Sequence, residues 1–118
     1  MAVARLKRRP QFLAVAASGL KVATPGVIVQ ALRRGDKDAP RLGLTASRKI
    51  GGAVERNRAR RRLRAAAEAV IPLAGGAGHD YVLIARRATL TRPFALMVEE
   101  LGRALRRLDA ASRPLEDR

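Results

Sequence analysis

Hydrophobic residues recur with helical spacing in some segments of this 118-residue chain and with strand spacing in others. Residues 10–17 begin with a proline, which suits a first helical position, and Gly19 follows as a stop, so a short helix is predicted. That helix is expected to carry Phe12, Leu13 and Ala16 on one side.

Three segments have the pattern of strands. Residues 27–32 are β-branched and apolar, and residues 41–47 alternate apolar with polar positions. Residues 80–86 are apolar enough to predict a strand covered on both faces. The polar residues 33–40 are predicted to form a hairpin loop between the first two strands, and residues 72–78 a loop before the third.

Two longer segments have helical periodicity. Behind Pro93, apolar residues recur at i, i+3, i+4 and i+7 as far as Leu108, and Glu99 is placed to pair with Arg103. Residues 54–70 predict another helix with a narrow apolar stripe. The stripe consists of Ala59, Leu63, Ala66 and Val70, with Ala67 at its edge.

The predicted order of elements is helix, strand, strand, helix, strand, helix. This order indicates a single small α+β domain over residues 1–118, with two layers and a three- or four-stranded, mainly antiparallel sheet. The ordered core is expected to span about residues 5–108, and the tail, residues 110–118, to be frayed.

Composition narrows the classes of function. The chain has no cysteine, which removes disulfides, thiolate metal sites and cysteine nucleophiles and fits a reducing compartment. No apolar run approaches the ~20 residues of a transmembrane helix, and the basic residues 1–9 lack the apolar segment of a signal peptide. A cytoplasmic location is therefore expected.

Net charge is the property of the composition that indicates a partner most strongly. Lysine and arginine number 25 against 10 acidic residues, which gives a formal net charge of +15. A surplus of this size destabilises the compact state by self-repulsion, so it favours a polyanionic partner such as nucleic acid. GC-rich coding can explain why arginine outnumbers lysine 21 to 4, but not why bases outnumber acids.

The charge is concentrated in the predicted helix "AVERNRARRRLR" (53–64). Residues 48–64 contain eight bases and one acid, so this segment holds +7 of the net +15. A merely solvated face normally mixes both signs. The pattern predicts a helix that is held by its apolar stripe and has all its arginines facing outward, where they bind phosphates by bidentate hydrogen bonds and counterion release.

A glycine turn precedes this helix. Arg48 and Lys49 are predicted to end the second strand, and Gly51 and Gly52 to turn the chain sharply. The free N–H groups at the helix start could hold a further phosphate, or the glycines could serve the turn alone. The sequence leaves both interpretations open.

The stretch "GLTASRKIGGAVERNRARRRLR" (43–64), followed by "DYVLIARR" (80–87), resembles the protein subunit of bacterial ribonuclease P. The family signature is an R-N-R-x-[KR]-R-x-x-R helix after a G-L-x-x-[SR]-[KR]-K-x-G-x-A-V strand and turn. With the N-terminal "RLKRRPQF", the resemblance covers roughly residues 5–108. It assigns RNA binding to Arg48, Lys49, Arg56, Asn57, Arg58, Arg60, Arg61 and Arg64.

The resemblance implies more than the spacing predicts. In this family a large RNA is the catalyst, and it removes the 5′ leader of precursor tRNA with Mg²⁺ that the RNA and substrate hold. The polypeptide is then an accessory subunit without catalytic residues and without a protein cage for the metal, and a left-handed βαβ connection joins two of its strands. A cleft between the first helix and the sheet holds the leader, which places Phe12 in its wall and Arg48 and Lys49 near its floor.

This chain departs from the family pattern at three positions. Ala16 and Gln30 stand where an aromatic residue is common, and Gly52 replaces the usual asparagine of the turn. Base stacking on an aromatic side chain contributes about 1–3 kcal/mol per base. Leader binding is therefore expected to depend more on charge and shape here.

Other functions make different demands on the sequence. A protein-only nuclease needs convergent carboxylates, for which Asp36 with Asp38 and Glu99 with Glu100 are weak candidates, and His79 has no evident nucleophile to activate. A ribosomal or general RNA-binding protein shares the same electrostatics and stays open. A DNA-binding basic helix would need a dimerising heptad, and a membrane-surface helix a bulkier apolar face.

Overall fold

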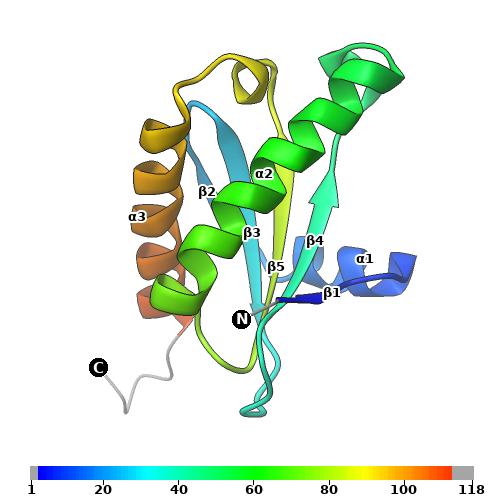
Figure 1. Cartoon of the computed structure of the whole chain (residues 1–118). Coiled ribbons are helices and arrows are strands. Elements are labelled where there is room, and N and C mark those ends of the chain that lie inside the picture. The colour runs from blue at the N-terminus through cyan, green and yellow to red at the C-terminus, as the bar shows by residue number, and fades with distance from the viewer. Residues whose placement is uncertain (1–2, 113–118) are drawn as a thin grey trace.

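The computed structural model describes residues 3–112 (Figure 1). Its elements in chain order are β1 (Ala4–Arg5), α1 (Arg9–Ala17), β2 (Leu20–Ala23), β3 (Val27–Arg33), β4 (Arg41–Thr45), the 3-10 helix η1 (Arg48–Ile50), α2 (Ala53–Ala74), β5 (His79–Ala85), the 3-10 helix η2 (Arg87–Leu90) and α3 (Phe94–Ser112).

The sheet has the strand order β1-β4-β5-β3-β2. The predicted hairpin between residues 27–32 and 41–47 is wrong, because β5 lies between β3 and β4 and pairs antiparallel with β3 and parallel with β4. β5 is the most apolar strand and is buried at six of its seven positions, as predicted, so it takes the centre of the sheet. The sheet is thus mixed and five-stranded instead of mainly antiparallel with three or four strands.

The parallel pairing of β4 and β5 makes β4-α2-β5 a βαβ unit. Figure 1 shows α2 in front of the sheet with β4 and β5 both running upward, and β5 on the left of β4. Seen from the helix side, a right-handed connection would move to the right, so this one is left-handed. The implied left-handed connection is confirmed, and it is rare among βαβ units.

Helices α2 and α3 cover one face of the sheet and enclose the main core with it. The inward strand positions alternate with a period of two, as in Val27, Val29 and Ala31 of β3. Of the α3 positions predicted to share the apolar face, five are buried, namely Met97, Leu101, Ala104, Leu105 and Leu108. Val98 is half-buried, and Phe94, in the first turn, is exposed. Residues 110–112, expected to be frayed, continue α3, and residues 113–118 lie outside the described part of the chain.

Helix α1 lies on the opposite face and forms a second, smaller core. Val15 is fully buried there and packs with Leu6 and Val82. The sheet is therefore covered on both faces. The predicted two-layer arrangement did not include the partial third layer that α1 forms. Of the residues predicted to share one side of α1, Phe12 is half-buried against this second core, whereas Leu13 and Ala16 are exposed. The residue that points fully inward is Val15, which the pattern did not single out.

The sequence patterns missed three features. The edge strands β1 and β2 are too short for a clear alternation. Helix α2 continues through Pro72 to Ala74, beyond the predicted end at residue 70, and its last turn replaces part of the expected loop.

Within residues 3–112, no helix combines the length and apolar character needed to cross a bilayer.

Candidate nucleic-acid interface

Helix α2 is anchored by the predicted stripe. Its buried residues are Ala59, Leu63, Ala66, Ala67, Val70 and Ile71. Four of the six are alanine or valine, so the helix axis can lie close to the sheet and to α3. Burial of this stripe, together with the packing of α2 against α3, holds the helix against the repulsion among its arginines.

The signature residues of α2 keep much of their surface in solvent. Asn57, Arg58 and Arg61 are exposed, whereas Arg56, Arg60 and Arg64 are half-buried. Their polar contacts stay within the same turn of helix: Arg60 Nη1 donates to Asn57 Oδ1 at 2.9 Å, and Arg56 Nε donates to the carbonyl of Gly52 at 3.4 Å. Within residues 3–112, no salt bridge joins an arginine of α2 to a carboxylate.

Arg62 is the exception to the predicted outward row. Its Nε donates to the carbonyl of Thr89 at 2.8 Å, and its Nη2 donates to the carbonyl of Arg92. The same Nη2 lies 3.9 Å from Sδ of Met97. The expectation that Arg62 faces solvent is wrong because it borders the apolar stripe, three positions after Ala59, where its long side chain reaches the start of α3.

The turn before α2 uses its two glycines differently. Gly51 has φ of +147°, in the region that favours glycine, and a Cβ there would lie 3.0 Å from Cβ of Glu55. Gly52 is the N-cap residue in an extended conformation and provides no side-chain cap. Arg48 and Lys49 are exposed in η1, three positions and more beyond the end of β4, instead of on the strand itself.

The face of the sheet beside α1 is the place predicted for the leader. The half-buried ring of Phe12 lies against Gly43 of β4. Gln30 of β3 belongs to the same face, because it is paired with Val82 of β5, and it is paired on its other side with the exposed Lys21. The sequence analysis did not single out Gly43. Its position between two inward leucines could have indicated that it faces the opposite side of the sheet.

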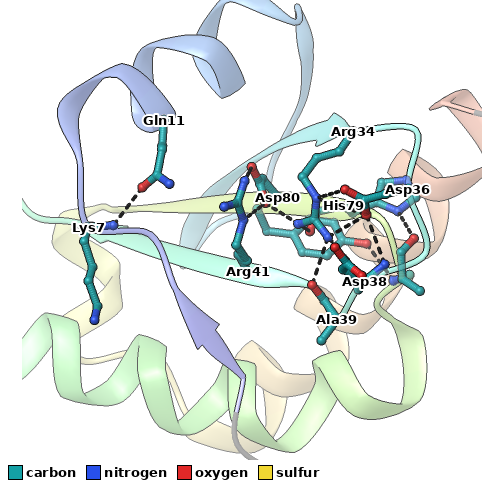
Figure 2. A network of polar contacts seen from close by, with 12 residues as sticks. Lys7, Gln11, Arg34, Asp36, Asp38, Ala39, Arg41, His79 and Asp80 are labelled. Atoms are coloured by element: carbon teal, nitrogen blue, oxygen red, sulfur yellow. Dashed lines mark hydrogen bonds and ion pairs between the residues drawn. The ribbon is translucent and has the colours of Figure 1, made fainter.

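An ion-pair network lies at the end of the sheet where β4 and β5 begin (Figure 2). The carboxylate of Asp80 is almost fully buried and accepts hydrogen bonds from Arg41 Nε and Nη2 at 2.7 Å each and from Arg34 Nη1 at 2.5 Å. Burial alone would raise the pKa of Asp80, but the hydrogen bonds from the two guanidinium groups outweigh it and lower that pKa. Arg34 also pairs with Asp36, and its hydrogen bond lowers the pKa of the Asp36 carboxyl.

The carboxylates considered for a nuclease are engaged elsewhere or isolated. Asp36 is held by Arg34, Glu99 lies 3.6 Å from Arg103 as predicted, and Glu100 accepts two hydrogen bonds from Arg92. Among residues 3–112, no group of three or more histidine or acidic side chains is placed to hold a metal ion.

His79 is buried at the start of β5. Its ring stacks on Tyr81 with centroids 5.7 Å apart, and its Nε2 lies 3.8 Å from Asp109 of α3. Its Nδ1 lies 3.1 Å from the carbonyl of Ala77. These contacts give His79 a structural role in joining the β5 start to α3.

Comparison with known proteins decides the family. A sequence model with the description "Ribonuclease P" matches residues 2–109. The chain belongs to the ribonuclease P protein family. This family supplies the protein component of bacterial ribonuclease P, a ribonucleoprotein of tRNA processing, so ribonuclease P RNA is the partner of this chain. The alternative of a ribosomal or unrelated RNA-binding protein is thereby excluded.

Curated relatives agree over most of the chain. The ribonuclease P protein component of Paramagnetospirillum magneticum is 48% identical over 110 residues, which cover 90% of this chain and 83% of the relative. That of Gluconacetobacter diazotrophicus is 50% identical over 103 residues, covering 87% and 89%.

Solved structures of ribonuclease P proteins have the same fold. The Thermotoga maritima protein matches with a TM-score of 0.74 and 27% identity, covering 87% of this chain and 96% of that one. The Staphylococcus aureus protein matches with a TM-score of 0.73 and 25% identity, covering 94% and 97%. A further structure is of a Staphylococcus aureus mutant described as having defective mRNA degradation activity, with a TM-score of 0.74, 26% identity and coverage of 89% and 87%.

Proposed function

We propose that this chain is the accessory subunit of ribonuclease P, in which the arginines of α2 bind the catalytic RNA and the RNA performs the cleavage. One observation carries the proposal: within residues 3–112, the signature arginines of α2 have no carboxylate partner. The opposite face of the helix is held in the core by its buried stripe. Guanidinium groups without a carboxylate partner can bind phosphates with little loss of free energy, because no ion pair within the protein has to break first.

The distribution of acidic residues supports this assignment. Asp36, Asp80, Glu99 and Glu100 all pair with arginines outside α2. Glu55, in the first turn of α2, is the one acid among residues 48–64. The positive potential of the helix is therefore left unscreened for a polyanion, and association should depend steeply on salt.

The 5′ leader of precursor tRNA is assigned to the face of the sheet beside α1. Phe12 supplies one half-buried ring for base stacking, and Lys21 supplies an exposed positive charge on the same face. Ala16 is exposed one turn after Phe12 and adds no second ring. The leader is thus held by one stacking contact together with charge and shape.

Catalysis and Mg²⁺ binding are assigned to the RNA. Most of the candidate carboxylates are paired with guanidinium groups, so freeing them for a metal would mean breaking those ion pairs. Phosphates of the catalytic RNA and the substrate then supply the oxygen ligands that Mg²⁺ prefers.

The test is the double variant Arg60→Ala/Arg61→Ala, measured by binding to ribonuclease P RNA over a range of salt concentrations. We expect affinity to fall roughly 30- to 900-fold, since each of the two lost charge-assisted hydrogen bonds contributes about 1–2 kcal/mol. The slope of log affinity against log salt should become shallower by about 1.4–1.8 for two lost phosphate contacts. The melting temperature should stay unchanged or rise, because like-charge repulsion is relieved.

The matched control removes two exposed arginines from α3, as Arg106→Ala/Arg107→Ala. This variant has the same net charge as the α2 variant. An equal loss of affinity in both would mean that only net charge matters and would overturn the assignment to α2. A large loss of melting temperature in the α2 variant would show that its two side chains are structural.

A further inference from the structure

Arg62 makes contacts unlike those of the other arginines of α2. Two donors of its guanidinium group bind backbone carbonyls on the segment between β5 and α3. Nε donates to the carbonyl of Thr89, and Nη2 donates to that of Arg92. Its neighbour Arg61, one position earlier, is exposed and makes no such contact. Two adjacent arginines in one cationic run therefore have different surroundings.

The segment that Arg62 holds is itself closely tied into the fold. We call residues 86–92 the η2 corner. The hydroxyl of Thr89 is fully buried, accepts a hydrogen bond from the Arg86 N–H at 2.8 Å and donates to the carbonyl of Gly26 at 2.5 Å. The Arg86 side chain donates to the carbonyl of Thr24 at 2.8 Å. The corner thus connects α2 with the turn between β2 and β3.

The η2 corner also carries positive charge into solvent. Arg86 and Arg87 are both exposed. Arg92, at the other end of the corner, is neutralised by its two hydrogen bonds to Glu100. The charge available to a polyanion is therefore at the β5 side of the corner, and the corner packs against α2.

We infer that Arg62 is a positioning residue: its guanidinium fixes the η2 corner against α2, so that Arg86 and Arg87 and the signature arginines meet the RNA as one rigid cationic surface. A rigid charge array binds a folded polyanion more tightly than two arrays that move independently, because less conformational freedom is lost on binding. The inference rests on the proposed function, since it requires α2 to bind RNA.

A planar fork suits this role better than a point charge. Its Nε and Nη2 donors lie in one plane at a fixed spacing and reach two carbonyls of different residues at once. Because those donors are occupied by the protein, Arg62 does not contribute a phosphate contact, and counterion release on binding does not include it.

The experiment compares Arg62→Gln with Arg61→Gln in binding to ribonuclease P RNA across a salt series. Both variants remove one charge from adjacent positions. We expect Arg61→Gln to make the salt slope shallower by about 0.7–0.9, as for one lost phosphate contact. Arg62→Gln should leave the slope unchanged, weaken affinity by a few-fold to about tenfold, and lower the melting temperature by about 4–8 °C. Binding is measured well below the melting temperature, so that both variants are folded.

Each outcome decides between distinct statements. A shallower slope for Arg62→Gln would make Arg62 a phosphate contact, and wild-type affinity at unchanged slope would leave it with a structural role only; either result overturns the inference. An unchanged slope for Arg61→Gln would instead contradict the proposed role of α2. If Arg62→Gln does not fold, Arg62→Lys serves, because it keeps the charge but loses the fork: weaker binding at unchanged slope supports the inference, and wild-type affinity overturns it.

Discussion

The ring of Phe12 lies directly against the backbone of Gly43. A Cβ built on Gly43 would lie 2.4 Å from Cε1 and 2.7 Å from Cζ of that ring, closer than carbon atoms can approach. Glycine at this point of β4 therefore sets how deeply the α1 aromatic sits on the sheet. The contact links a residue of the central sheet to the proposed leader-binding face.

Gly43→Ala should displace the Phe12 ring. We expect the free energy of unfolding to fall by about 1–3 kcal/mol from overpacking, and binding of leader-bearing precursor tRNA to weaken more than binding of mature tRNA. Denaturant unfolding and paired binding assays with the reconstituted holoenzyme measure both effects. Gly102→Ala is the matched control, because a Cβ there meets Val70 at an ordinary 3.5 Å. That control should be neutral or slightly stabilising.

Phe12→Ala removes the stacking surface itself. We expect roughly 5- to 150-fold weaker binding of precursor tRNA, from about 1–3 kcal/mol of stacking, and little change for mature tRNA. Leu13→Ala, at the exposed neighbour on α1, should affect neither. Equal losses for precursor and mature tRNA would remove Phe12 from the leader site.

Asp80→Asn tests the ion-pair network at the end of the sheet. Loss of the carboxylate leaves Arg34 and Arg41 without their shared partner, so we expect about 2–3 kcal/mol lower stability at pH 7, less than for a fully buried pair because Arg41 is partly exposed. The folded pKa of Asp80 is below its unfolded value, so its contribution is present above about pH 4 and is lost as pH falls through the folded pKa.

Urea unfolding from pH 7 down to pH 2.5 measures this effect. The stability difference between the wild-type protein and Asp80→Asn should shrink below about pH 4. Asp38→Asn, at an exposed carboxylate of the neighbouring loop, is the control and should follow the wild-type curve. A difference that stays constant with pH would show that the Asp80 charge is not what stabilises the fold.

The isolated polypeptide should not cleave precursor tRNA in Mg²⁺. The expectation follows from the ion pairs that occupy Asp36, Glu99 and Glu100. A cleavage assay without the RNA subunit checks it, with the reconstituted holoenzyme as the positive control. Cleavage that is abolished by Glu100→Gln would instead place a nuclease site in the protein.

Local pattern predicted those parts of the site that depend on one helix. The stripe of α2 from Ala59 to Val70 was predicted from spacing alone, because side chains three and four positions apart share a helix face whatever surrounds them. The length of the signature over residues 43–64 was also enough to indicate the family. Arg62 was misplaced because it lies at the border of the stripe, where a long side chain can turn either to solvent or to a neighbouring carbonyl.

The strand order needed more than local pattern. Alternation predicted that residues 27–32, 41–47 and 80–86 are strands, but not that β5 separates the other two. Adjacency in sequence favours a hairpin, whereas burial of the most apolar strand at the centre favours the observed order. Burial of the most apolar strand at the centre depends on the whole sheet, so it cannot be inferred from any one segment.

Residue type and short-range spacing were therefore enough to predict the helices, the concentration of positive charge on α2 and the family. Which arginines remain for RNA depends instead on how the elements pack together. Arg34, Arg41 and Arg62 are directed to Asp80 or to backbone carbonyls that are distant in the chain, because a guanidinium group pairs with whichever acceptor the packed elements bring within about 3 Å.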